Sequence, residues 1–102
     1  MKLKNRIAII TGGGKGIGAE LSLKLASEGA KIVIAEMDVP NGELVAKKIK
    51  ENNGEAIVVK TNVAEEDSAN DMAKEAINVF GKIDILINNA GTRHINNILD
   101  HT

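Results

Sequence analysis

A chain of 102 residues with a formal net charge of −1 is the size of one small domain, and this charge argues against a nucleic acid or another polyanion as its partner. The absence of cysteine excludes disulfides, thiolate metal sites and cysteine nucleophiles. The apolar run behind the basic N-terminal segment, residues 7–10, is too short for the core of a signal peptide. No stretch is long enough to cross a membrane, so we expect a cytoplasmic protein with no membrane partner.

Four short apolar runs, rich in β-branched residues, predict four β-strands at residues 7–10, 32–35, 56–59 and 83–87. The first three runs are almost continuously apolar, which is typical of strands that are buried on both faces of a parallel sheet. Segments with helical periodicity separate the runs. The resulting order, β-α-β-α-β-α-β, predicts an α/β fold with a parallel sheet and right-handed crossovers.

Three helices are expected between these strands. The first is predicted over residues 16–28, the second from near Pro40 to residues 53–54, and the third from about Glu65 to Gly81. Their apolar periodicity indicates which side chains face the sheet. The residues expected in the core are Met37, Leu44, Val45, Ile49, Ala69, Met72, Ala73, Ala76, Ile77 and Phe80.

A glycine-rich segment, TGGGKGIG at residues 11–18, lies between the first strand and the first helix. Its glycines let the backbone bend and approach a phosphate, while the helix N-terminus offers free N–H groups and the positive end of its dipole. The segment is not a P-loop, because Lys15 is followed by Gly16 and not by serine or threonine. A glycine-rich turn without a ligand is the alternative to a pyrophosphate site. The predicted site residues are Thr11, Gly12, Gly14, Lys15, Gly16, Ile17 and Gly18.

The spacing of this segment, T-G-x-x-x-G-x-G, resembles that of the short-chain dehydrogenase/reductase family. Residues 88–91 have the sequence NNAG, which matches the family's N-N-A-G motif, and Asn62-Val63 stands where the family has Asp-Val. The resemblance covers residues 5 to about 91. It implies a Rossmann-type doubly wound parallel sheet in three αβα layers, with the strand order 3-2-1-4 in this part of the fold.

The resemblance implies that these motifs surround the adenosine half of an NAD(P) cofactor. The family's aspartate meets the adenine amino group, and the amide oxygen of Asn62, next to Val63, can accept the same hydrogen bond. Capping of the third helix is an alternative role for Asn62 that is compatible with the first. Asn88, Ala90 and Gly91 would lie beside the ribose, where the two small residues let the cofactor pass close to the backbone.

Two residues bear on the choice between NAD and NADP. Glu36 ends the second predicted strand, where a carboxylate can accept hydrogen bonds from the ribose hydroxyls and repel a 2′-phosphate. Lys15 points the other way, since a basic residue at this place often accompanies NADP in the family. We expect NAD, because the carboxylate would lie against the 2′-position itself, and NADP is the alternative.

The resemblance further implies hydride transfer between NAD(P) and an alcohol or carbonyl substrate. The family's catalytic Asn, Ser and Tyr-x-x-x-Lys lie beyond the matched stretch, and the chain contains no tyrosine. We therefore expect residues 1–102 to be a single dinucleotide-binding domain, truncated before the catalytic half, with no catalytic residue and no activity alone. A catalytically inert dinucleotide-binding module and a self-associating fragment are the alternatives.

Two further expectations concern metals and assembly. His94 and His101 are the only histidines, and they lack the additional ligands that a metal site needs. The third crossover should place the third helix alone on one face of the sheet, and the fourth strand should be an open edge. A half-covered apolar face and an unpaired apolar edge both favour association, so we expect a homo-oligomer.

Overall fold

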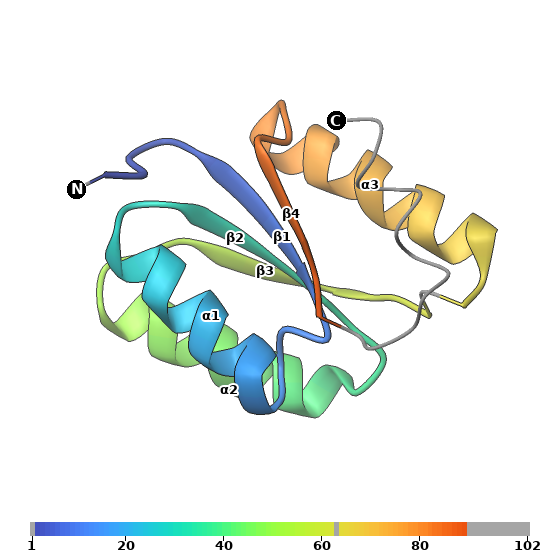
Figure 1. Ribbon diagram of the computed structural model, residues 1–102, viewed down its shortest axis with the longest axis horizontal. Helices are drawn as coiled ribbons and strands as arrows, with labels where there is room; N and C mark the ends of the chain where they lie inside the picture. Colours follow the sequence, from blue (N-terminus) through green and yellow to red (C-terminus); the bar gives the residue numbers. More distant parts are fainter. Residues whose placement is uncertain (1, 63, 90–102) are drawn as a thin grey trace.

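The computed structural model describes residues 2–62 and 64–89 of the chain. Within these ranges, parallel strands alternate with helices and form a sheet in the order β3-β2-β1-β4, which confirms the predicted Rossmann-type topology (Figure 1). The elements in chain order are β1 (Ile7–Thr11), α1 (Gly16–Ser27), β2 (Lys31–Glu36), α2 (Val39–Glu51), β3 (Ala56–Lys60), α3 (Glu66–Phe80) and β4 (Ile85–Asn88).

The helices cover the sheet unequally. Helices α1 and α2 lie on one face, and α3 lies alone on the other (Figure 1). Alternate residues of β1 and β2 supply two separate cores, so both strands must be apolar on both faces. The core on the side of α1 and α2 contains Ala8, Ile10, Ile32, Ile34, Val45, Ala46 and Ile49. The core on the side of α3 contains Ile7, Ile9, Val33, Ala35, Met72 and Ala76.

The sequence prediction of the core was wrong at three positions. Leu44, Met37 and Ile77 are 60%, 56% and 49% exposed. Leu44 and Ile77 each lie one residue away from the buried stripe of their helix, which includes Val45 in α2 and Ala76 in α3. One residue corresponds to about 100° of rotation, so their side chains leave the core.

The fourth strand begins later than predicted, at Ile85 instead of residue 83. The side chain of Asp84 explains the difference, because its Oδ2 accepts a hydrogen bond of 2.9 Å from the backbone N–H of Ile7. Arg6 and Lys82 lie 3.5 and 3.3 Å from the same carboxylate. The N–H of Ile7 and these two cations hold the pKa of Asp84 below its usual value. The side chain of Asp84 thus takes the N–H of Ile7, while the backbone N–H of Asp84 donates to the carbonyl of Ile7 over 2.9 Å.

The helix ends follow the sequence closely. Helix α2 is followed by Asn53 at φ 68°, the left-handed conformation expected after a helix C-terminus. Helix α3 begins one residue later than predicted, with Glu65 as its N-cap and Glu66 and Asp67 in its first turn. In the described part of the chain, no helix is both long and apolar enough to cross a membrane.

Candidate functional site

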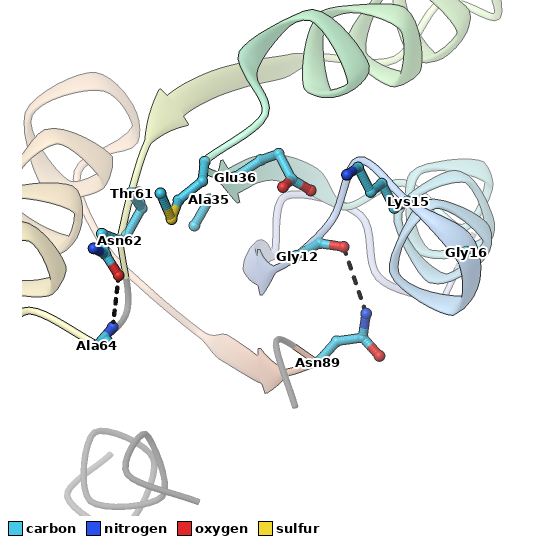
Figure 2. A pocket seen from close by; sticks show the side chains of 10 residues that line it. Gly12, Lys15, Gly16, Ala35, Glu36, Thr61, Asn62, Ala64 and Asn89 are labelled. Atoms are coloured by element: carbon cyan, nitrogen blue, oxygen red, sulfur yellow. Dashed lines mark hydrogen bonds between the residues drawn. The ribbon is translucent and has the colours of Figure 1, made fainter. Parts of the chain in front are cut away.

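A cavity of about 450 Å³ opens at the carboxyl ends of β1, β2 and β3 (Figure 2). In an open parallel α/β sheet this is the edge where ligands bind, beside the strand at which the order reverses. The predicted site residues that line the cavity are Gly12, Lys15, Gly16, Glu36 and Asn62.

Three glycines of the β1–α1 loop and the first turn of α1 have different structural roles. Gly12 adopts φ 65° and donates its N–H to the carbonyl of Ala35 over 2.8 Å, which joins the loop to β2. Gly16 adopts φ 50°, and, apart from its chain neighbours and the backbone of its own helix, no described residue would lie within 4 Å of a Cβ atom placed there. A Cβ on Gly18 would instead overlap the carbonyl oxygen of Gly12 and crowd the side-chain amide of Asn89. Gly18 therefore permits close packing of α1 against the loop, and Gly16 leaves space at the cavity.

Within the part of the chain that the structure describes, no side-chain cap is found at the N-terminus of α1. Lys15 is its N-cap residue and makes no capping hydrogen bond, and the first turn contains no acidic residue. By contrast, α2 is capped by Asp38, whose side chain accepts from the N–H of Asn41. The first N–H groups of a helix have no intrahelical partner, so the open end of α1 is a ready site for an anion.

Glu36 lies at the end of β2 and is only 8% exposed. Two backbone N–H groups hold its carboxylate in place. Its Oε1 accepts the N–H of Gly14 over 2.9 Å, and its Oε2 accepts the N–H of Asp38 over 3.2 Å. Gly14 is not among the residues that line the cavity. A Cβ there would lie 2.7 Å from the backbone nitrogen of Gly42 in α2. The role of Gly14 in the structure is to let the loop, α2 and Glu36 come together.

Lys15 places a cation in the cavity wall. Its Nζ lies 3.3 Å from Oδ2 of Asp38, and its side chain is 62% exposed. The N–H of Asn41 is the main cause that lowers the pKa of Asp38, and Lys15 contributes further. Figure 2 shows the Lys15 side chain and the Glu36 carboxylate on the same side of the cavity.

Asn62 forms the turn that leads into α3 without being its N-cap. Its Oδ1 accepts the N–H of Ala64 over 3.1 Å (Figure 2), and its backbone N–H donates to Oγ of Ser68 over 2.9 Å. An amide oxygen has two lone pairs, so one acceptor position remains beside the cavity. The local turn therefore orients Asn62 while using only one of the two acceptor positions on its Oδ1.

The last residues of β1 and β4 are joined by hydrogen bonds behind the cavity. Thr11 is 1% exposed, and its Oγ1 donates to the carbonyl of Ile87 over 3.3 Å and accepts the N–H of Asn89 over 2.9 Å. Oδ1 of Asn88 lies 3.5 Å from the same hydroxyl. Thr11 and Asn88 thus position the cavity wall without lining it.

The remaining predicted site residues divide into two groups. Ile17 is 68% exposed on α1, and Gly18 is buried at the start of that helix; neither lines the cavity. Val63, Ala90 and Gly91 lie outside the described residues. His94 and His101, at which no metal site was predicted, also lie outside them.

Some lining residues were missed by the sequence prediction: Ala35, Met37, Thr61, Ala64 and Asn89. Met37 was assigned to the core and instead lies at the cavity. The amide of Asn89 reaches the carbonyl of Gly12 over 3.5 Å (Figure 2). Most of these residues directly follow a residue that was predicted, so adjacency at strand ends was the signal that could have found them.

Comparison with known proteins identifies the family. The sequence profile described as short chain dehydrogenase matches residues 6–102. The chain belongs to this family. A relative from Thermotoga maritima, named as an uncharacterized oxidoreductase, is 36% identical over 98 residues, which cover 96% of this chain and 38% of that protein. The 7alpha-hydroxysteroid dehydrogenase of Escherichia coli K12 is 35% identical over 91 residues, 89% of this chain and 36% of the enzyme.

Solved structures of the family superpose well on the chain. A 7alpha-hydroxysteroid dehydrogenase in complex with NADH and 7-oxo glycochenodeoxycholic acid has a TM-score of 0.87 and 35% identity, over 89% of this chain and 36% of that one. A metagenomic short-chain oxidoreductase in complex with NADP has a TM-score of 0.85 and 33% identity, over 90% and 42%. The chain spans less than half the length of these relatives, and the matched part is the nucleotide-binding portion of the family.

Proposed function

We propose that the cavity binds the adenosine and pyrophosphate portion of NAD(P). The observation that carries this proposal is the uncapped N-terminus of α1 beside Gly16, where a side chain would meet only open space. The pyrophosphate would accept hydrogen bonds from the first N–H groups of α1 and gain from the helix dipole. Gly12 and Lys15 line the same space, and Gly14, Gly18, Ile17 and Thr11 act by shaping or bordering the loop.

Glu36 favours NAD over NADP. A carboxylate offers about four acceptor positions, and the backbone donors of Gly14 and Asp38 use two of those on Glu36. The others can accept the ribose hydroxyls, whereas a 2′-phosphate would meet a fixed negative charge. Its two backbone donors prevent the carboxylate from swinging away.

The adenine and ribose contacts complete the proposed site. The free lone pair on Oδ1 of Asn62 would accept the adenine amino group, with Val63 beside it. Asn88, which lies where β1 and β4 end side by side, would border the ribose. Roles for Val63, Ala90 and Gly91 stay predictions from the sequence.

For the whole protein we propose hydride transfer between NAD(P) and an alcohol or carbonyl substrate. NAD(P) supplies or accepts the hydride when bound; the part of the protein described above holds and orients the dinucleotide. Proton transfer to the substrate oxygen needs a positioned acid–base group, which contributes typically about 10²–10⁴-fold, and the family's tyrosine has no counterpart among these 102 residues. A module that binds the dinucleotide without catalysis is the second candidate.

We also propose that the 102-residue chain self-associates. Within the described residues, β4 pairs with β1 alone, and its residues are only half-buried. Ile57, Val59 and Leu86 on the face of α3 are likewise only partly covered. An unpaired apolar edge beside a partly covered face is a template for another chain. Light scattering at micromolar concentration should detect a dimer or larger species, and a stable ligand-free monomer would contradict this.

Calorimetric titration with NAD⁺ and NADP⁺ tests the cofactor proposal. We expect weak binding, because these residues supply the adenosine side of the site and not all of the nicotinamide contacts. We expect NAD⁺ to be preferred because of Glu36. A preference for NADP⁺ would contradict the role of Glu36 and favour Lys15, and failure to bind either dinucleotide would contradict the proposal as a whole.

Absorbance at the NADH band tests the proposal that these 102 residues bind the dinucleotide without catalysing hydride transfer. We expect no turnover by the purified 102-residue chain with any alcohol. Turnover by this chain, which contains no tyrosine, would contradict the proposal. A cytoplasmic location also stays a prediction, which cell fractionation can check.

A further inference from the structure

Asp38 connects Lys15 and Glu36, the charged residues in the described part of the cavity wall. Its backbone N–H donates to Glu36 over 3.2 Å, and its Oδ2 lies 3.3 Å from Nζ of Lys15. The carboxylate itself is fixed by α2, since Oδ1 accepts the N–H of Asn41 over 3.2 Å and Oδ2 accepts Nδ2 of Asn41 over 2.7 Å. Asp38 therefore draws Lys15 toward an anchored point outside the cavity lining.

We propose that Asp38 sets cofactor specificity by holding the ammonium group of Lys15 away from the 2′-position of the adenosine ribose. This inference rests on the proposed function, because it requires the ribose to lie beside Glu36. A 2′-phosphate would have to compete with Asp38 for Lys15, whereas the 2′-hydroxyl of NAD needs no cation. Asp38 is thus a positioning residue that acts through Lys15.

The expected effect is modest but selective. The Lys15 and Asp38 side chains are 62% and 38% exposed, so water screens their attraction. Ion pairs of this kind change equilibrium constants by about two- to fivefold. Asn41 already fixes the Asp38 carboxylate, so formation of the ion pair restricts mainly the side chain of Lys15. The consequence is a shift of the NAD to NADP ratio and not a loss of binding.

A role limited to capping α2 makes a different prediction. Asparagine caps helices about as well as aspartate, and its Oδ1 can still accept the N–H of Asn41. Asp38→Asn therefore keeps the cap and removes the charge. A pure cap would leave the ratio of the two cofactor affinities unchanged, whereas a specificity role changes it.

The test is a double-mutant cycle with the wild-type chain, Asp38→Asn, Lys15→Gln and the double variant. Dissociation constants for NAD⁺ and NADP⁺ are measured by calorimetry at low ionic strength, with circular dichroism as the check of folding. We expect Asp38→Asn to tighten NADP⁺ binding about two- to fivefold and to leave NAD⁺ nearly unchanged, only where Lys15 is present. Added salt should reduce the gain.

Glu55→Gln is the matched control. Glu55 also forms a surface ion pair, 3.4 Å from Lys31, and it lies at the opposite, amino end of the sheet. Its loss removes the same charge without touching the cavity, so the cofactor ratio should not move. An equal gain in Glu55→Gln, or an equal gain for Asp38→Asn in the Lys15→Gln background, would overturn the inference alone. Failure of the wild-type chain to bind either dinucleotide would overturn the proposed function and the inference with it.

Discussion

The two ends of the parallel sheet use carboxylates in different ways. At the amino end, Asp84 accepts a backbone N–H and pairs with Arg6 and Lys82, so groups of the protein itself compensate its negative charge. At the carboxyl end, Glu36 is held by backbone N–H groups of Gly14 and Asp38 and borders a cavity. The first arrangement closes a strand junction. The second fixes a charge in place while leaving room for a ligand, which is what a binding site requires.

The largest effect is expected at the carboxyl end, from Gly18→Val. A side chain there collides with the backbone of Gly12 and with Asn89, so α1 must move away from the loop. Overpacking of this kind costs about 1–3 kcal/mol of the free energy of unfolding. We expect a lower urea midpoint together with loss of dinucleotide binding in calorimetry. A variant that folds and binds normally would mean that the site lies elsewhere.

Gly16→Val tests more directly whether the carboxyl end of the sheet binds the ligand. Its φ of 50° disfavours a side chain, but no described residue outside its chain neighbours and its own helix backbone lies within 4 Å of the new Cβ, so the new side chain would occupy the space proposed for the ligand. We expect a stability loss of about 1–2 kcal/mol from the strained backbone, with dinucleotide binding abolished.

Gly81→Val is the matched control for Gly16→Val. Gly81 also has a positive φ, 88°, and open space around its Cβ, but it lies after α3 near the amino end of the sheet. The two variants should lose similar stability in urea titrations, while Gly81→Val keeps its affinity for NAD⁺. Equal losses of affinity would show that backbone strain, and not ligand space, explains the effect at Gly16.

Asp84→Asn tests the amino end. Because folding lowers the pKa of Asp84 from its ordinary value of 3.8, the ionised group stabilises the fold above that pH and ceases to do so as the pH falls through the lowered pKa. The variant should therefore unfold at lower urea than wild type at pH 7, with a difference that shrinks in acid.

Asp71→Asn, at an exposed position on α3, removes the same charge and should leave both the midpoint and its pH dependence unchanged. Dinucleotide affinity should be unaffected in both variants. A pH-independent difference for Asp84→Asn would contradict the role of its charge.

The sequence predicted the sheet order and the glycine loop because both depend on local patterns. Continuous apolar runs indicate buried strands, and glycines mark a tight turn. It could not predict that Gly14 packs against Gly42, or that Ser22, 0% exposed, hydrogen-bonds the carbonyl oxygens of Gly13 and Gly18. Those contacts depend on the tertiary approach of α1 and α2 to the loop. For the same reason periodicity misplaced Leu44, which lies only one residue from the buried stripe.

The smallest effect is expected at Asn62, where a turn and a proposed contact share one side chain. Asn62→Ala removes the acceptor for both Ala64 and the adenine amino group, and a single neutral hydrogen bond corresponds to about 0.5–1.5 kcal/mol. NAD⁺ affinity should therefore fall by about two- to tenfold. Asn62→Asp keeps an acceptor oxygen and should bind like wild type, which separates the acceptor from the amide as a whole. If Asn62→Ala and Asn62→Asp both bind like wild type, Asn62 serves only the turn into α3, and the adenine must be held by other residues.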